Sequence, residues 1–157
     1  NNENATSVQM AAIFQQQLRE IGVTMEIKGT EFATFFADVT KGDFQAYSLR
    51  WIGANNDPDF FNYVFHSKAV PPNGANRGRY ANPRVDELVE YARREVDTEK
   101  RKQAYREVQQ ILADDVPYIS LFYMDNVSVS TKRIEGVRLY PGADFDFLTD
   151  IRVRQFD

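Results

Sequence analysis

The stretch spanning residues 44–65, FQAYSLRWIGANNDPDFFNYVF, decides the fold that this sequence predicts. Residues 44–51 are rich in aromatic and aliphatic side chains and favour a strand. Asp57 and Pro58 are typical of a helix start, because Asp accepts hydrogen bonds from free N–H groups and Pro suits the first helical position. The polar loop between them, residues 52–56, then leaves the carboxyl end of a strand, where open α/β sheets usually bind ligands.

The residues at this loop suit contact with a small molecule. Trp51, the only tryptophan of the chain, stands at the strand end and offers a flat indole surface and one N–H donor. Asn55 and Asn56 offer both donors and acceptors, and Gly53 lets the backbone approach a ligand. Alternation places Arg50 on the opposite face of the strand, so Arg50 is the alternative to Trp51 for facing the ligand. We expect this corner to touch any small molecule that the chain binds.

The rest of the chain alternates between helical and strand patterns. Predicted helices cover residues 6–21 (capped by Thr6 or Ser7), residues 31–41, a run that starts at Asn82-Pro83, and a run from Asp97-Thr98 towards Pro117. Predicted strands cover residues 23–28, 44–51, 118–124, 127–131 and 137–140. This alternation favours an α/β fold in which some strands pair in parallel. Residues 67–81 show no periodicity, and so long a loop is either functional, at the rim of a ligand cleft, or a solvated excursion.

Composition excludes several classes of function. At 157 residues the length fits one domain. The net charge of −4 argues against a nucleic-acid partner, which needs a basic face. The chain has no Cys, which removes disulfides and thiolate chemistry. No stretch approaches the roughly 18 apolar residues that a membrane span requires.

Catalytic and metal-binding patterns are missing from the sequence. The single His, His66, leaves no material for a Ser-His-Asp triad or a zinc site. The dinucleotide-binding and phosphate-loop motifs are absent as well. Asp57 and Asp59 suggest paired carboxylates for glycoside chemistry, although helix capping is the favoured role of Asp57. We therefore expect no enzymatic activity, no cofactor and no metal.

The order of the segments resembles a known family. The strings QQQLREIGV, VTMEIKG, EFATFFADVTKGDF, YSLRW and IGANNDPDFF follow one another as in the C-terminal lobe of the family 5 extracellular solute-binding proteins, the oligopeptide- and dipeptide-binding components of bacterial ABC importers. The similarity continues through RGRYANPRVDELVEYARREVDTEKRKQAYREVQQILADDVPYISLFY. It covers nearly the whole chain, and the ordered set of segments, not one motif, carries it.

The resemblance implies a periplasmic-binding-protein-like lobe of type II, with a mixed sheet flanked by helices. Residues 1–141 would form the C-terminal ligand-binding lobe, and residues 142–157 a tail that returns to the other lobe of the same parent chain. The chain opens without an initiator Met, and we interpret it as a fragment of that longer protein. The family is exported, and is periplasmic or anchored outside the membrane. Its members bind a peptide or another small solute between two lobes and deliver it to an ABC permease.

The loop departs from the family pattern at one position. Peptide binders of the family carry an Asp in the loop after the Trp, where it pairs with the ligand's α-amino group, and the matching residue here is Ala54. An alanine cannot neutralise an ammonium, and a buried unpaired charge is costly. Either Asn55 or Asn56 substitutes through neutral hydrogen bonds, or the cargo is not a peptide with a free amino group. The ligand-binding residues that we predict are Arg50, Trp51, Gly53, Ala54, Asn55 and Asn56.

Two alternatives remain beside the importer component. The same lobe would also suit a sensor that feeds a signalling receptor, and the genomic neighbours of the parent gene would separate these two roles. The other alternative is a carboxylate-based hydrolase. That enzyme would lose its activity on Asp57→Asn, whereas a binding lobe would lose only a helix cap, which costs about 1 kcal/mol.

Overall fold

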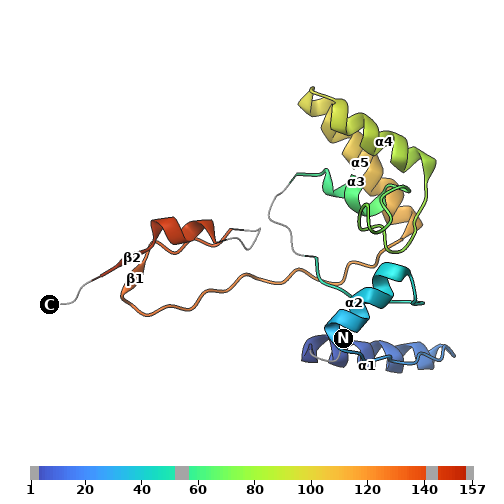
Figure 1. Cartoon of the computed structure of the whole chain (residues 1–157), viewed down its shortest axis with the longest axis horizontal. Coiled ribbons are helices and arrows are strands. Elements are labelled where there is room, and N and C mark those ends of the chain that lie inside the picture. The colour runs from blue at the N-terminus through green and yellow to red at the C-terminus, as the bar shows by residue number, and fades with distance from the viewer. Residues whose placement is uncertain (1–3, 52–56, 141–144, 155–157) are drawn as a thin grey trace.

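Helices dominate the structure. The computed structural model of the chain describes residues 4–51, 57–140 and 145–154. The elements in these ranges are α1 (Ala5–Glu20), α2 (Phe32–Lys41), α3 (Phe60–Phe65), α4 (Pro83–Arg94), α5 (Thr98–Asp115), β1 (Ile134–Glu135), the 3-10 helix η1 (Asp146–Asp150) and β2 (Arg152–Val153). Figure 1 shows α3, α4 and α5 gathered at one end, α1 and α2 beneath them, and an extended arm that leads from α5 to β1 and β2.

Local chemistry sets most helix ends where the sequence predicts them. Gly42 ends α2 in the left-handed conformation, with φ of 85°, which glycine adopts without steric cost. Asn82 caps α4 by accepting from two backbone N–H groups, and Pro follows it in the first helical turn. Asp97 caps α5 in the same way. These three ends are confirmed because each depends only on residues adjacent to it in sequence.

The predicted start of α1 is wrong by a short distance. Asn4 caps this helix, not Thr6 or Ser7, and the Oδ1 atom of Asn4 accepts from the backbone N–H of Ser7 at 3.0 Å. Asn is as good a cap as Ser or Thr. Where three such residues stand close together, the sequence does not decide which of them leaves the helical conformation.

None of the five predicted strands is a strand in the structure. The one sheet among residues 4–51, 57–140 and 145–154 is the antiparallel pair β1–β2, with Ile134 opposite Val153 and Glu135 opposite Arg152. Residues 23–28, 44–51, 118–124, 127–131 and 137–140 form no ladder with any part of the described chain. Alternation shows which side chains share a face, but a strand also needs a neighbouring backbone to exchange hydrogen bonds with. The predicted mixed sheet is therefore absent from the described residues.

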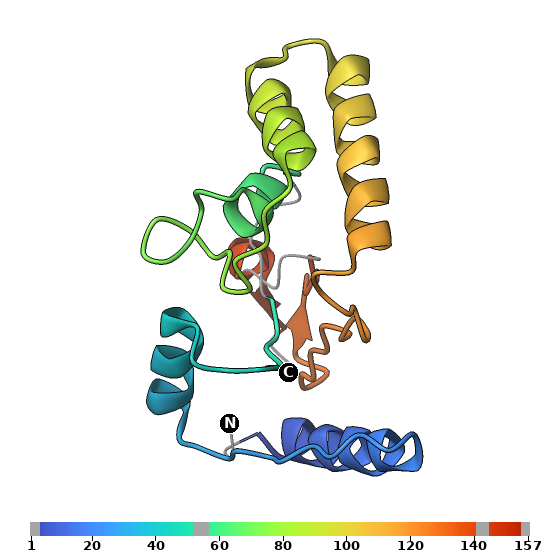
Figure 2. The same ribbon diagram turned by 90° about the vertical axis from the view of Figure 1, so that its right-hand side faces the viewer.

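The core lies between the three clustered helices. Nine buried side chains pack together there: Val64, Phe65, Val85, Leu88, Val89, Ala92, Ala104, Tyr105 and Val108. Figure 2 shows α4 and α5 as an antiparallel pair, with α3 and the loop of residues 67–81 beside α4. α1, by contrast, has no buried residue. Since burial of apolar surface is the main favourable term in folding, α3, α4 and α5 are the stable part of the fold.

Candidate functional site

The predicted binding corner is only partly described by the structure. Gly53, Ala54, Asn55 and Asn56 lie outside the described residues. Trp51 is described, and its indole packs edge-on against the ring of Phe60, with 5.1 Å between ring centroids. The side chain of Trp51 keeps 41% of its surface exposed, which leaves area for further contact.

Arg50 does not join Trp51. Its side chain is exposed and takes no part in the ring and cation contacts that surround the indole in the described chain. This arrangement agrees with alternation, which places neighbouring residues on opposite faces of an extended segment. Trp51 is consequently the better candidate of the two for a ligand contact.

The structure adds a residue that sequence analysis missed. The guanidinium carbon of Arg77 lies 5.2 Å from the centroid of the Trp51 ring and 5.1 Å from that of Phe36 in α2. A guanidinium at this distance from an aromatic ring is attracted by the negative face of the ring. Three segments that are distant in sequence therefore meet at this point, and we call Phe36, Trp51 and Arg77 the Arg77 cluster.

Arg77 was missed because it lies in the aperiodic loop of residues 67–81. Its contacts with Phe36 and Trp51 join residues 41 and 26 positions away, and no local pattern encodes such pairs. The length of the loop was the only signal in the sequence, since loops this long are often functional.

The buried side chain of Asn76 fixes the backbone beside Arg77. Its Nδ2 atom donates to the carbonyl oxygens of His66 and Tyr80, at 3.1 and 2.7 Å. Its Oδ1 atom accepts from the backbone N–H of Tyr80 at 2.9 Å. The preceding residue, Ala75, is fully buried and donates its N–H to the carbonyl of Tyr63 in α3. The loop is thus anchored to the helical core directly before the arginine.

A glycine permits the same loop to pack closely. A Cβ atom at Gly74 would stand 2.5 Å from the carbonyl oxygen of Ala69 and 2.7 Å from its Cβ. Backbone atoms cannot move aside as a flexible side chain can. A larger residue would therefore push the loop segments at positions 69 and 74 apart. The close approach at Gly74 therefore helps to place Asn76 and Arg77.

Two tyrosines extend the aromatic surroundings of the cluster. The hydroxyl groups of Tyr47 and Tyr118 are hydrogen-bonded at 2.9 Å, and the ring of Tyr118 packs edge-on against Phe65 of the core. Burial raises the pKa of Tyr118 above its ordinary value, its hydrogen bond with the Tyr47 hydroxyl raises it further, and the charge of Arg77 acts in the opposite direction. Tyr118 therefore remains a neutral hydroxyl at physiological pH.

Asp57 and Asp59 each form an ion pair with an arginine. α3 begins at Phe60, so the predicted start at Asp57 is wrong. Asp57 Oδ1 instead accepts from Arg101 Nη2 at 2.7 Å, and from the N–H of Asp59 at 2.8 Å. Asp59 pairs with Arg93 Nε at 2.9 Å. The hydrogen bond from Arg101 is the main cause of the lowered pKa of Asp57, whereas the general acid of a glycosidase needs a raised one.

His66 is a packed structural residue. It is 6% exposed, and its Nδ1 atom accepts from the backbone N–H of Lys68 at 3.0 Å. The ring proton of the neutral form is therefore assigned to Nε2, which lies 3.0 Å from Glu90 Oε1. Both nitrogens are engaged by the protein, so neither offers a lone pair to a metal or a substrate.

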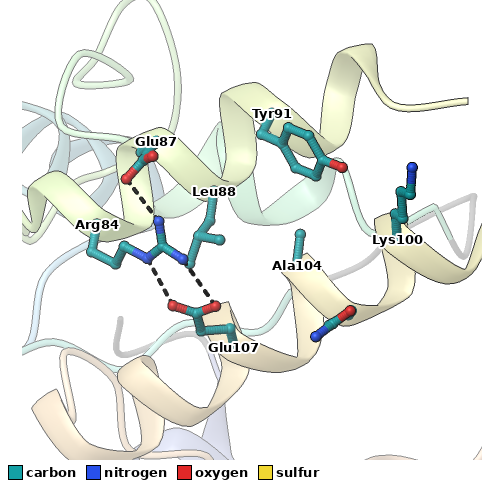
Figure 3. Close-up of a pocket in the computed structure, with 8 residues that line it drawn as sticks. Arg84, Glu87, Leu88, Tyr91, Lys100, Ala104 and Glu107 are labelled. Carbon is teal, nitrogen blue, oxygen red and sulfur yellow. Dashed lines mark hydrogen bonds and ion pairs between the residues drawn. The ribbon is translucent and has the colours of Figure 1, made fainter. Parts of the chain in front are cut away.

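A groove of about 330 Å³ lies between α4 and α5, away from the Arg77 cluster. Figure 3 shows Arg84 reaching across this groove, with its guanidinium directed at two carboxylates. Arg84 Nε is 2.7 Å from Glu107 Oε1, and Arg84 Nη1 is 2.8 Å from Glu87 Oε2. These side chains are between 44% and 69% exposed, and such pairs contribute little to stability. The groove is the outer seam of a helix pair whose polar groups already satisfy one another.

Residues 4–51, 57–140 and 145–154 contain neither a candidate membrane span nor a candidate metal site. No helix in these ranges is both long and apolar enough to cross a membrane. No group of three or more His, Cys, Asp and Glu side chains in the same ranges is placed to hold a metal ion.

The sequence matches known proteins over most of its length. Residues 1–72 match the family model "Bacterial extracellular solute-binding proteins, family 5 Middle". The chain is 29% identical over 140 residues to di/tripeptide-binding protein 2 of Pseudomonas aeruginosa (strain UCBPP-PA14), an alignment that covers 88% of this chain and 26% of the relative. It is 30% identical over 144 residues to the probable D,D-dipeptide-binding periplasmic protein DdpA of Escherichia coli (strain K12), which covers 90% of this chain and 27% of that protein.

A solved structure has the same fold. The oligopeptide-binding protein AppA of Bacillus subtilis, determined in complex with a nonapeptide, superposes with a TM-score of 0.76 at 24% identity. The superposition covers 97% of this chain and 30% of that one. The chain thus spans about a quarter of the length of the curated relatives, 26% and 27%. Its fold is that of a periplasmic-binding-protein-like lobe, and its sequence is similar to the family 5 bacterial extracellular solute-binding proteins, whose model matches residues 1–72.

Proposed function

We propose that the chain is the C-terminal ligand-binding lobe of the substrate-binding component of an ABC importer. One observation carries this proposal: 88% to 92% of the chain aligns with proteins named for the binding of di- and tripeptides or oligopeptides. The cargo of the full-length protein is then a peptide or another small solute, bound between two lobes and delivered to a membrane permease.

The same proposal assigns the parts of the chain and its location. Residues 1–141 form the lobe, and residues 142–157 return towards the other lobe of the parent chain. The protein acts outside the cytoplasm, in the periplasm or anchored to the outer face of the membrane. The family description "extracellular" and the periplasmic relative DdpA support this location.

We place the ligand site at the corner that Trp51 marks. The proposed contacts are Trp51, Gly53, Ala54, Asn55 and Asn56, with Arg50 as the alternative to Trp51. The exposed face of the indole and the Arg77 cluster beside it support this placement. A buried aromatic surface with a few directed polar groups is the usual composition of a small-molecule site.

The lobe binds its cargo without chemical change. The relatives are named as binding proteins and not as enzymes, and the ion pairs of Asp57 and Asp59 occupy the carboxylates that the hydrolase alternative would need. No feature of the described residues favours the sensor alternative over the importer component.

A thermal-shift screen of the full-length protein tests the proposal. The compounds are di- to pentapeptides, N-acetylated peptides, sugars and metal chelates. A ligand at 100 times its Kd should add about 2.7 kcal/mol to the free energy of unfolding, which is readily detected. Stabilisation by at least one peptide or small solute supports the proposal. Failure of every class in the screen would reject it.

A further inference from the structure

Two nitrogens of the Arg77 guanidinium have no hydrogen-bond acceptor among the described residues. Its Nε and Nη1 atoms are buried, and no described residue accepts from them. Burying a charged group without hydrogen-bond partners costs free energy. A guanidinium remains protonated in proteins, so Arg77 cannot avoid this cost by becoming neutral. Buried polar groups in folded proteins are nearly always hydrogen-bonded. The two nitrogens therefore indicate an acceptor that the described part of the chain does not supply.

No carboxylate of the described chain reaches Arg77. None of the ion pairs among residues 4–51, 57–140 and 145–154 includes it. The loop after Trp51, Ile-Gly-Ala-Asn-Asn over residues 52–56, contains no acidic residue. The neighbours of Arg77 are the rings of Phe36 and Trp51, and the hydroxyl of Tyr118 lies within range of its charge. The corner is thus a site of positive charge with aromatic walls.

The position of this charge is restrained before any ligand arrives. The contacts with the rings of Phe36 and Trp51 restrict the movement of the guanidinium. Asn76 holds the adjacent backbone through three hydrogen bonds. A group that is already ordered loses less conformational freedom when it binds. Its planar array of N–H donors matches the two oxygens of a carboxylate.

We infer that Arg77 binds a carboxylate of the solute, so that the Trp51 corner selects an acidic group and rejects an ammonium. This inference rests on the proposed function, because the carboxylate belongs to the cargo. Rejection follows from charge, since a cation placed beside Arg77 would be repelled. It agrees with the sequence after Trp51, where Ala54 stands in place of the family's Asp.

Four peptides test the inference on the full-length protein. They are Ala-Phe-Ala with a free C-terminal carboxylate and with a C-terminal amide, each with a free and with an N-acetylated amino group. Calorimetric titration should give a Kd for the acids about 10- to 100-fold lower than for the matching amides, the range expected for a hydrogen-bonded charged group. The ratio of the two Kd values should fall to about 1 in Arg77→Gln and remain unchanged in Arg106→Gln, a control on the exposed face of α5.

Arg77→Lys separates charge from geometry. Lys keeps the positive charge but has no planar fork, so it should restore part of the preference for the acids. If a variant binds the peptide amides with the same Kd as the wild type, that variant is folded. If Arg77→Gln does not fold, the comparison of acids and amides on the wild type decides alone.

Each outcome has a distinct meaning. Equal Kd values for acids and amides in the wild type, or a preference that survives in Arg77→Gln, would overturn the inference and leave the proposed function intact. If none of the four peptides binds the wild type, the inference is overturned, whereas the thermal-shift screen still decides whether another solute binds.

Discussion

Asn76→Ala should remove the support of the Arg77 cluster and lower stability strongly. Asn76 is 2% exposed and makes three side-chain hydrogen bonds, at 2.7, 2.9 and 3.1 Å, to backbone groups of His66 and Tyr80. Alanine makes none of them and leaves these backbone groups without partners. At about 1 kcal/mol for each lost bond, we expect the free energy of unfolding to fall by about 3 kcal/mol.

Urea unfolding of the 157-residue chain, followed through Trp51 fluorescence, measures this loss. Trp51 is the only tryptophan of the chain and contacts Arg77, so its signal reports directly on the cluster. The matched control is Asn73→Ala, since Asn73 is exposed in the same loop and bonds to Val70 through its backbone N–H. The control should change stability by less than about 0.5 kcal/mol. A loss below about 1 kcal/mol for Asn76→Ala would show that these hydrogen bonds do not hold the loop.

Two further changes test the packing of the helices. Val89→Ala removes two methyl groups from a fully buried position in α4, and should cost about 2 kcal/mol in urea unfolding; a cost near zero would contradict the packed core. Asp57→Asn tests the pair with Arg101, which lowers the pKa of Asp57 in the folded chain. The pair therefore stabilises the fold above the unfolded-state pKa of this carboxyl, and its contribution is lost as the pH falls through the folded-state pKa. The variant should be less stable than wild type at pH 7 by under about 1 kcal/mol, since the pair is partly exposed, and equally stable once wild-type Asp57 is protonated. A stability difference that does not shrink with falling pH would refute this role of the pair.

Features that depend on neighbouring residues were predictable from the sequence. The left-handed glycine after α2, the Asn-Pro start of α4 and the Asp cap of α5 each lie where local hydrogen bonding places them. α3 begins three residues after the predicted start, and the Asp57 carboxylate that accepts from the N–H of Asp59 also accepts from Arg101, 44 positions later. No local pattern contains that partner.

The prediction of the strands was wrong for a related reason. Residues 44–51 and 118–124 have the composition of strands, but a ladder needs a second backbone beside each of them. The described chain supplies such a partner only to β1 and β2. The resemblance to family 5 named the fold class correctly, since the order of segments persists even where the ladders are not formed within this chain.

The residues of the candidate site also differ in whether a local sequence signal points to them. Trp51 was proposed from a local signal, a single indole before a polar loop, and its contact with a ligand stays a prediction. Arg77 was not, because its significance comes from two rings that long stretches of chain bring to it and from the acceptors that it lacks. Its two buried nitrogens without an acceptor distinguish it from the other arginines that the structure describes.

Hydrogen exchange of the full-length protein, with and without the peptide or solute that stabilises it most, tests the central claim most directly. The claim is that the solute lies at the Trp51 corner and in contact with the Arg77 loop. We predict slower exchange on binding in fragments that cover residues 44–51 and 75–80, and no change in the outer seam between α4 and α5. Protection confined to α4 and α5, with residues 44–51 and 75–80 unchanged, would contradict the account.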